Sequence, residues 1–591
     1  MDKKQKAIEN TVFGTWAQDA YKRQITLTPQ EAAAVSRRPH KKRYVGMFYF
    51  AWVGQQGERH EDVYDIEQLL KTNPKALWDP PGPPEAPLYM NYFFAEPLFG
   101  YYNMADPYIL RRHIELFIAA GIDFIALDYT NGIVYENVWP LLLALLEEYR
   151  LAGWHVPQVT FFTKTRSDYV VDYIFRNIHS KNLYPELWFR GNYEKPLMIA
   201  PPDSLTAEQA AFYHVRPPQW PNEERDERAF PYMDWIRPQT VYQDVMNVSV
   251  AQHTAGAFSF SYKRMHFACG KENRGRGYSG ITGCNCTADV PKCVNFIEQW
   301  NHAEAVDPDM VFVTGWNEWT ALKLFSEAEP GFPLWVDTFN IEYSRDIEMT
   351  KGGYDDNYYL QLIKHVRRYK GVQPEIPCSS CRTIDVCGDP AQWEKVETVF
   401  YNIATERIER DHMGYIPKIH YKQPAPQNFI REVRVCHDWE NLYFYIRTDR
   451  DITAHEDGQS NWMNLFLGVD SGLSSGCEAD AAAYSWEGFQ YVVNRSPADS
   501  RRTSLERSVG GYRFVSAGWL RYSCQSNVMQ LSVPFAAIGL HADAFRLRFK
   551  VADSVIHPED IMDYYVSGDT VPLGRLSYQY GNAERQSSEQ Q

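Results

Sequence analysis

Apolar runs that alternate with amphipathic helical stretches between residues 43 and 371 constrain the fold of this chain most. The first apolar run, at 43–52, is followed by a helical stretch at 106–121 that ends at a glycine. Further apolar runs follow at 122–129 and 157–164, again separated by helical stretches. Such alternation predicts a parallel sheet, and its length favours a (β/α)8 barrel of the TIM type over an open doubly wound sheet. No glycine-rich phosphate loop follows the first run, which argues against a nucleotide-binding fold.

The pattern changes after residue 371. Residues 372–392 are rich in Pro, Cys and Gly and are predicted to form a linker. Beyond them, short runs of alternating apolar and polar residues are separated by Asp, Asn, Gly and Ser, which predicts an antiparallel β-sandwich. The predicted organisation is an N-terminal extension at 1–42, the barrel at 43–371, the linker at 372–392, the sandwich at 393–582 and a disordered tail at 583–591.

Charge and aromatic content narrow the class of ligand. The formal net charge of −15 argues against nucleic acid or a membrane surface as the main partner, because both attract basic patches. Aromatic residues make up 15% of the chain, and the flat faces of such rings pack well on sugars. We therefore expect a glycan as the ligand. The sequence makes no prediction about oligomeric state.

The N-terminal region starts with basic side chains but lacks the apolar core of a secretion signal, and no other stretch is long enough to span a bilayer. We therefore expect a cytoplasmic protein, or a secreted one if a signal has been removed. The ten cysteines include two tight groups. Each group resembles half of a zinc site without completing one, so we expect ordinary thiols or local disulfides and no metal, with zinc as the alternative. The groups are Cys284, Cys286 and Cys293, and Cys378, Cys381 and Cys387.

Polar and aromatic side chains follow the predicted strands at the point where each strand ends. Asn317 and Glu318 come directly after the apolar run that begins at Met310, and two tryptophans flank them. Active sites of TIM barrels lie at the C-terminal ends of the strands, so these side chains are predicted to share one face. The residues at strand ends are Trp52, Asp128, Tyr129, Lys164, Asp234, His253, Trp316, Asn317, Glu318 and Trp319.

This set of residues fits the chemistry of glycoside hydrolysis. The reaction needs two carboxyl groups that flank the scissile bond, and Glu318 and Asp128 are candidates. Asn317 is expected to bind sugar hydroxyls, and tryptophan rings near Glu318 are expected to stack on the sugar and to raise the pKa of the carboxyl. We predict a hydrolase of poly- or oligosaccharides that needs no cofactor.

Other interpretations stay open for individual residues. Glu318 can form a salt bridge with a neighbouring Arg, Asp128 can have a structural hydrogen-bonding role, and His253 is favoured as a satisfied core histidine. Lys164 fits a ligand contact or a barrel ion pair equally well. The alternative function is a non-catalytic carbohydrate-binding protein on a glycosidase scaffold. A metal-dependent hydrolase is the weaker third hypothesis, because the strand ends supply no obvious set of metal ligands.

The stretches TGWNEW (314–319), GIDFIALDY (121–129) and YVGMFYFAW (44–52) resemble the glycoside hydrolase family 99-like barrels, which include the endo-α-mannosidases. The resemblance covers about residues 43–371 and implies a (β/α)8 barrel that cleaves glycans. In the endo-mannosidases the pattern continues as WNEWHE; the first glutamate assists the 2-hydroxyl of the substrate, and the second is the acid/base of a retaining mechanism. Glu318 matches the first, but Ala321 occupies the second position, so that mechanism does not carry over whole.

The segment 336–348 is predicted to supply the missing carboxylate, with Glu348 and Asp346 favoured over Asp128, and Arg345 as a ligand for an acidic sugar. The acids of this segment are Asp337, Glu342, Asp346 and Glu348. The acids Glu327 and Glu329 are expected to be solvated. A basic loop at 261–280 is predicted to overhang the same face, with a solvated charged loop as the alternative. Its side chains of interest are Tyr262, Lys263, Arg264, Arg274, Arg276 and Tyr278.

The C-terminal part resembles the family 9-like carbohydrate-binding modules in HDWENLYFYIRTD (437–449), NWMNLFLGVD (461–470) and WEGFQYVVNR (486–495). The resemblance implies a pair of aromatic rings that clamps a sugar. Trp462 and Trp519 are the possible counterparts, and Trp439 and Trp486 fit core positions at least as well.

Overall fold

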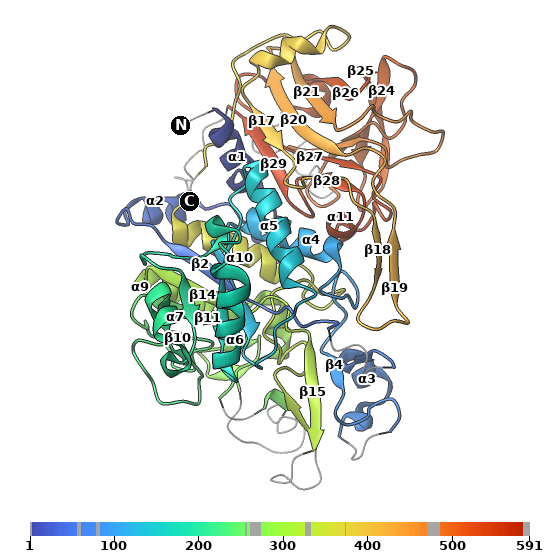
Figure 1. Ribbon diagram of the computed structural model, residues 1–591. Helices are drawn as coiled ribbons and strands as arrows, with labels where there is room; N and C mark the ends of the chain where they lie inside the picture. Colours follow the sequence, from blue (N-terminus) through green and yellow to red (C-terminus); the bar gives the residue numbers. More distant parts are fainter. Residues whose placement is uncertain are drawn as a thin grey trace.

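Two large β-sheets, one parallel and one antiparallel, organise the chain (Figure 1). The computed structural model describes residues 3–55, 61–78, 83–254, 257–259, 273–325, 333–372, 374–469 and 485–582. Within these residues no helix is long and apolar enough to cross a membrane. The predicted residues Tyr262, Lys263, Arg264, Glu327 and Glu329 lie outside the described part of the chain.

The parallel sheet has seven strands, and every neighbouring pair is parallel. Helices follow most of the strands along the chain, so the predicted alternation of strands and helices is confirmed. The order in the sheet is β11 (Val245–Ser249), β14 (Met310–Thr314), β2 (Tyr44–Tyr49), β5 (Phe124–Tyr129), β6 (Gln158–Thr163), β7 (Leu197–Ile199) and β8 (His214–Arg216). The helices are α4 (Pro107–Ala120), α5 (Trp139–Ala152), α6 (Ser167–Ile174), α7 (Ala207–Phe212), α9 (Val294–Val306) and α10 (Asn357–Lys370).

The two edges of this sheet approach each other through a short strand pair. β9 (Pro218–Gln219) follows β8 and pairs in parallel with β10 (Phe230–Pro231). Between β10 and β11 the carboxamide of Asn247 makes the hydrogen bonds that backbone groups make in a regular sheet. It donates to Tyr232 O and accepts from Asp234 N, both at 3.1 Å. The fold is therefore barrel-like. A complete (β/α)8 barrel, as predicted, is not confirmed within the described residues.

The sequence explains both the strands and the helix ends. β2 and β5 are buried along their whole length, as expected for parallel strands with both faces covered. α4 begins at the cap Asp106, which accepts from Tyr108 N at 3.0 Å, and ends at Gly121 with φ 72°. A left-handed residue at this position favours glycine, as the sequence predicted.

A small lobe, which we call the loop sheet, lies beside the parallel sheet and was not predicted. It consists of four short strands with their own apolar cluster, which includes Ile66, Tyr92, Ala321 and Trp335. Figure 1 shows β4, β15 and α3 (Ile66–Thr72) at the end of the molecule away from the antiparallel sheet. The strand order is β16 (Pro333–Val336), β15 (Thr320–Phe325), β4 (Asn91–Phe93) and β3 (Tyr64–Asp65).

The antiparallel sheet folds back on itself around an apolar core. Phe400 stacks on Tyr578 with ring centroids 4.3 Å apart, and Phe444 meets Phe549 at 5.4 Å. A separate antiparallel unit was predicted. The strand order is β1 (Thr15–Trp16), β29 (Ser577–Gly581), β27 (Arg546–Asp553), β22 (Asn464–Val469), β23 (Tyr491–Val493), β24 (Arg502–Ser508), β25 (Phe514–Gln525), β26 (Val528–Pro534), β21 (Asn441–Thr448), β20 (Ile430–His437) and β17 (Val399–Tyr401), with β28 (Asp569–Val571) paired to β27.

Residues of the predicted N-terminal extension and of the predicted linker pack on the antiparallel sheet. α1 (Lys3–Phe13) leads into β1, which pairs with β29, so the N-terminal residues join the C-terminal unit. Ile384 and Val386 are buried with Trp393 on the outer face of the sheet. Parts of residues 1–42 and 372–392 therefore belong to packed structure.

The two units share one continuous apolar core. Trp486 and Tyr565 of the C-terminal part belong to the same cluster as the residues of the parallel sheet. Polar contacts reinforce this interface: Tyr565 OH donates to Asp356 Oδ2 at 3.0 Å, and Arg410 pairs with Asp106 at 2.8 Å. The C-terminal unit is therefore docked on the parallel α/β unit.

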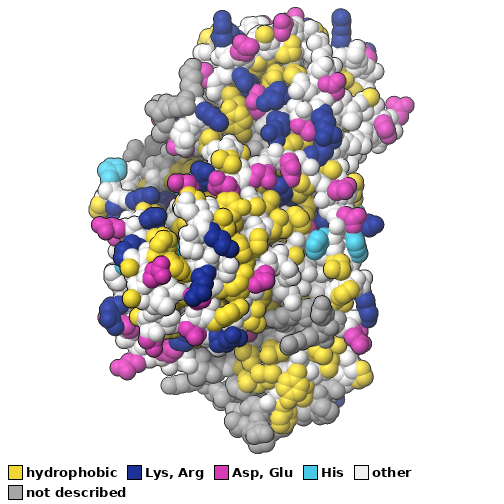
Figure 2. Space-filling model, in the orientation of Figure 1, with side chains coloured by type: hydrophobic (Ala, Val, Ile, Leu, Met, Phe, Trp, Pro, Cys, Tyr) yellow, Lys and Arg dark blue, Asp and Glu magenta, His cyan; other side chains and the backbone are white. Residues whose placement is uncertain are grey.

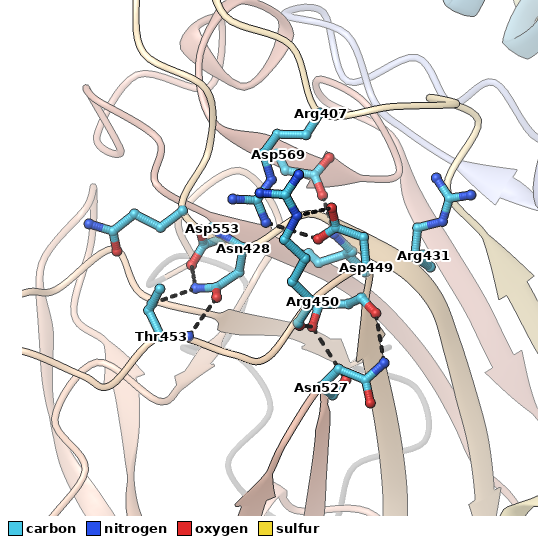
Figure 3. A network of polar contacts seen from close by, with 12 residues as sticks. Arg407, Asn428, Arg431, Asp449, Arg450, Thr453, Asn527, Asp553 and Asp569 are labelled. Atoms are coloured by element: carbon cyan, nitrogen blue, oxygen red, sulfur yellow. Dashed lines mark hydrogen bonds and ion pairs between the residues drawn. The ribbon is translucent and has the colours of Figure 1, made fainter.

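Polar networks hold the loops of the antiparallel unit. Figure 3 shows Asn428 between Asp553 and Thr453, to which its Nδ2 donates at 3.0 Å each, beside the ion pair of Arg407 and Asp449 at 2.9 Å. Because the carboxylate of Asp553 also accepts from backbone N–H groups, its burial is matched by hydrogen bonds.

The tryptophans of the antiparallel unit divide into buried and exposed pairs. Trp462 is buried and donates to Thr453 O at 2.9 Å, so it does not offer a face to a sugar, contrary to one possibility from the sequence. Trp486 is buried, whereas Trp439 is 71% exposed and Trp519 is 55% exposed. The core position considered for Trp439 is therefore wrong.

The cysteines within the described residues are free thiols, and four of the six in the two tight groups are exposed. In the same part of the chain no group of three or more His, Cys, Asp or Glu residues is arranged to hold a metal ion.

Candidate active site

The carboxyl ends of three neighbouring strands build the candidate site. β14, β2 and β5 are adjacent and parallel, with Tyr49 of β2 opposite Leu127 of β5. Asp128 lies at the end of β5, and Glu318 follows β14 after a short turn. Because the carboxyl ends of parallel strands meet at one edge of a sheet, Asp128 and Glu318 share that edge.

The segment that leads to α10 lies against the turn after β14. Gly315 N donates to Arg345 O at 3.0 Å, and Ile347 N donates back to Gly315 O at 3.1 Å. Glu318 N donates to Asp346 Oδ1 at 2.6 Å. These bonds bring Arg345 and Asp346 beside Glu318.

Arg345 is held between Glu318 and His253. Its Nη2 donates to Glu318 Oε2, and its Nη1 lies 2.7 Å from His253 Nε2. Because a guanidinium only donates, His253 Nε2 accepts, and the proton of the ring sits on Nδ1, which donates to Thr254 O at 2.8 Å. Loss of hydration and the nearby Arg345 lower the pKa of His253 to about 3, so the imidazole is neutral.

Four carboxyl groups, which we call the carboxyl cluster, surround this guanidinium: Asp128, Glu318, Asp337 and Asp346. Burial raises the pKa of each one, and the charge of Arg345 opposes the shift in every case. The pKa of Asp128 is raised to about 6 and that of Asp346 to about 7. One cation therefore faces several acids whose pKa values are raised by burial.

The members of the carboxyl cluster differ in access. Asp337 is exposed, yet the surrounding protein raises its pKa, and its backbone is left-handed with φ 75°. Asp128 is buried and accepts from Thr130 N at 3.0 Å. Asp346 is fully buried, and its Oδ2 has no hydrogen-bond partner among the described residues.

Aromatic rings line one side of the cluster. Tyr232 lies within electrostatic reach of Arg345 and of three members of the carboxyl cluster. Its ring stacks on Trp220 at 5.2 Å, and Lys164 Nζ lies 4.8 Å from the Trp220 ring. Lys164 also pairs with Glu223, so both interpretations of this lysine, ion pair and site residue, stay open.

Several residues predicted to bind substrate lie in the core instead. Trp316 packs on Phe117, and Trp319 stacks on Phe94, both with centroids 4.7 Å apart. This corrects the prediction that these rings stack on a sugar, because both side chains are fully buried.

Asn317 and Tyr129 are also structural. The carboxamide of Asn317 accepts from Phe50 N and donates to Phe50 O, both at 2.9 Å, so it fastens the turn to the end of β2. Tyr129 is buried against Phe161, on the opposite side of β5 from Asp128. Neither side chain is free to contact a ligand, contrary to the prediction.

Glu348, favoured from the sequence as the second carboxylate, lies in a closed environment. Its Oε2 accepts from Tyr102 OH and from Trp319 Nε1, both at 2.6 Å, and its Oε1 lies 2.9 Å from His113 Nε2. It is fully buried. This placement contradicts a catalytic role and assigns Glu348 to the support of Trp319.

Arg274 and Arg276 of the basic loop have different surroundings. Arg276 is fully buried and donates to Asp346 O at 2.6 Å, so it supports the site from below and does not overhang it as predicted. Arg274 is partly exposed and lies 4.0 Å from the ring of Trp235 and 5.2 Å from that of Tyr278.

Two further acids and one ring complete the predicted set. Glu342 accepts from Thr287 Oγ1 at 2.8 Å, and buried Asp234 accepts from Thr240 N at 3.1 Å, so both have structural partners. Trp52 is almost buried next to Phe50.

Sequence reasoning gave Asp337 no special place and did not find Tyr232 and Trp220. Asp337 directly follows the apolar run of β16, and Tyr232 directly follows β10, so the end-of-strand signal was present. Both strands are too short to stand out as apolar runs. His253 was favoured as a core residue, but it is partly exposed and contacts Arg345.

A recess of about 480 Å³ lies elsewhere and is lined by residues that include Tyr193, Lys195 and His214. His214 begins β8, so this recess opens at the N-terminal edge of the sheet. It is therefore not part of the candidate site.

Figure 2 shows apolar side chains gathered in the middle of the lower half of the molecule and at its lower end.

Comparison with solved structures gives a weak likeness. No protein-family model and no curated protein matches the chain. Two solved structures of a family GH99 endo-α-mannosidase from Bacteroides thetaiotaomicron, one in complex with bis-tris-propane, are 13% identical and cover 55% of this chain and 97% of theirs. Their TM-scores are 0.31 for the complex and 0.25 for the other structure. Scores this low support no conclusion about the activity of this chain.

Proposed function

We propose that the chain is a glycoside hydrolase whose reaction takes place at the carboxyl cluster. The observation that carries the proposal is the convergence of four acids with raised pKa values on one guanidinium, at the carboxyl ends of parallel strands. Glycoside hydrolysis needs one carboxyl that keeps its proton and one that acts as an anion. The acids of the carboxyl cluster have different surroundings, which can give two of them these two different protonation states.

The contacts suggest which acid takes which role. Burial raises the pKa of Glu318, but the charge-assisted hydrogen bond from Arg345 opposes this shift and stabilises the anion, so we assign Glu318 the role of nucleophile or general base. Asp128 has no such contact and has its pKa raised to about 6, which suits a proton donor. Asp337 is the other candidate donor, because it is the most exposed acid of the cluster.

Trp220 supplies the sugar-stacking face in this proposal. The ring is partly exposed and stacks on Tyr232, which itself lies beside the acids. A partly exposed indole next to buried carboxyls offers the apolar surface that the faces of sugar rings prefer. The substrate class is therefore a poly- or oligosaccharide.

A screen of purified protein against plant and microbial polysaccharides, with analysis of the products, tests the proposal. We expect the wild-type chain to release sugars from at least one glycan and Glu318→Gln to release almost none from it. Binding without products from any glycan would favour the alternative of a non-catalytic carbohydrate-binding protein. Equal product release by both forms would place the activity away from the carboxyl cluster.

A further inference from the structure

A β-hairpin of the C-terminal part reaches across the domain boundary. β18 (Arg410–Met413) and β19 (His420–Gln423) pair only with each other within the described residues. Figure 1 shows the hairpin projecting from the antiparallel unit along the side of the molecule toward β4. It therefore connects the antiparallel unit to the loop sheet.

The turn of the hairpin is buried against β4. Tyr415 N donates to Tyr101 O at 2.6 Å, and the Tyr415 ring meets Phe93 edge-on with centroids 4.9 Å apart. Asn91 Nδ2 lies 3.4 Å from Tyr415 OH. The approach is so close that a Cβ on Gly414 would lie 2.6 Å from Tyr101 O. Only glycine fits at that point.

The start of the hairpin, at Arg410, is also held by buried contacts. Arg410 Nε donates to Asp106 Oδ2 at 2.8 Å, and its Nη1 donates to Phe99 O at 2.9 Å. Both members of this ion pair are buried, and Tyr421 covers the guanidinium at 4.1 Å. A buried pair with good geometry specifies one position for the hairpin.

From Tyr415 a short series of contacts leads to the carboxyl cluster. Phe93 of β4 lies opposite Thr320 of β15, and Phe94 N donates to Trp319 O at 3.0 Å. These partners come directly after Glu318 in the chain. β16, the next strand of the loop sheet, ends one residue before Asp337. Two of the four acids therefore lie next to strands of the loop sheet in the chain.

The loop sheet needs such support. Its strands are 2, 3, 6 and 4 residues long in chain order. Short strands with a small apolar cluster open locally at low cost unless a neighbouring element packs on them. The hairpin is that element on the side of β4.

We propose that hairpin β18–β19 positions the carboxyl cluster, with Tyr415 as the positioning residue that fixes β4 and, through it, Glu318 and Asp337. The antiparallel unit then has a role in building the site, beyond any contact of its own with a glycan. The inference rests on the placement of the acids and not on the reaction that they perform.

Hydrogen exchange measured by mass spectrometry on the full chain tests the inference. In Tyr415→Ala we expect amides in 91–94, 318–322 and 334–337 to exchange about tenfold faster, because one aromatic pair and its packing are lost. Amides of β2, β5 and β14 should keep their wild-type rates. Tyr415→Phe should exchange like the wild type, because it keeps the ring contact and the backbone bond.

Met413→Ala is the matched control, because Met413 lies on the same hairpin and is largely exposed. It should leave all three segments unchanged. If Tyr415→Ala does not fold, Tyr415→Leu keeps most of the volume and should show the same local pattern at smaller amplitude. Unchanged exchange at 318–322, or uniform acceleration across the chain, would overturn the inference. A negative glycan screen would leave this exchange pattern intact, so the two proposals fail separately.

Discussion

Two glutamates near the end of β14 have opposite surroundings. Glu348 is enclosed by Tyr102, Trp319 and His113, which satisfy both of its oxygens. Glu318 has one guanidinium on one oxygen and two further acids nearby, Asp337 and Asp346. Both are buried, so burial does not distinguish them. The two glutamates differ in how fully hydrogen bonds and opposite charges compensate for the burial of the carboxyl group. Buried acids with incomplete compensation are the ones that mark functional sites.

The largest expected effect is on turnover at Glu318. Glu318→Gln keeps the shape but removes the charge and the titrating proton, so turnover should fall by about 10³-fold or more. Arg345 keeps three other carboxyls nearby, so the unfolding temperature should change little. Product release and thermal unfolding of the same sample measure both effects. A variant with near wild-type turnover would remove Glu318 from the reaction.

The reverse outcome is expected at Glu348. Glu348→Ala leaves Trp319 Nε1, Tyr102 OH and His113 without their acceptor, which should lower the free energy of unfolding by about 3 kcal/mol. Glu348→Gln keeps one acceptor oxygen and should cost less. Chemical denaturation measures these losses, and turnover per folded molecule should fall less than tenfold. Lost turnover with unchanged stability in Glu348→Gln would return Glu348 to the candidate acids.

The sequence predicted the parallel unit and the antiparallel unit because their periodicities are long and regular. Apolar runs such as 122–129 have the length and burial of parallel strands, and Gly121 marks the end of α4. The loop sheet was missed because β3 and β4 are too short to produce a periodic signal. It is held together by tertiary packing, which includes the contact of Tyr415 with Phe93.

The site was predicted in part for the same reason. Glu318, Asp128 and Arg345 follow or precede recognisable elements, and the structure brings them together. Trp316 and Trp319 were misplaced because an end-of-strand position does not tell which way a side chain points. Glu348 and Asp346 share one segment, yet only Asp346 accepts from Glu318 N, and this follows from pairing with Gly315 that no local pattern encodes.

A smaller effect on rate is expected at Asp128. Its pKa of about 6 predicts that kcat/KM falls as pH rises through about 6, because the proton donor is lost. Asp128→Asn should remove this limb of the pH profile and lower the rate by about 10²-fold. Asp337→Asn is the matched variant at the other candidate proton donor. If the limb persists in Asp128→Asn and disappears in Asp337→Asn, the proton donor is Asp337.

The smallest effect on turnover is expected at Asp569 of the antiparallel unit. This acid combines hydrogen bonds like those of Glu348 with a raised pKa like those of the carboxyl cluster. It is hydrogen-bonded like Glu348, since it accepts from Ile430 N at 2.6 Å and from Asn402 Nδ2 at 2.8 Å, but burial raises its pKa to about 7. In the unfolded chain an Asp has a pKa of about 3.9, so the folded state binds more protons between these values. Its contribution to stability is therefore complete below about pH 4 and is lost as pH rises through about 7.

Asp569→Asn should remove this slope. Between pH 4 and pH 8 the free energy of unfolding of the wild type should fall relative to that of the variant by about 4 kcal/mol, measured by chemical denaturation at several pH values. Asp449→Asn, at a partly exposed ion pair of the same unit, is the control and should keep the wild-type slope. Parallel stability curves for the wild type and Asp569→Asn would show that hydrogen bonds compensate fully for burial at this acid. The rule drawn from Glu348 would then extend to Asp569, and a raised pKa alone would no longer mark the carboxyl cluster as functional.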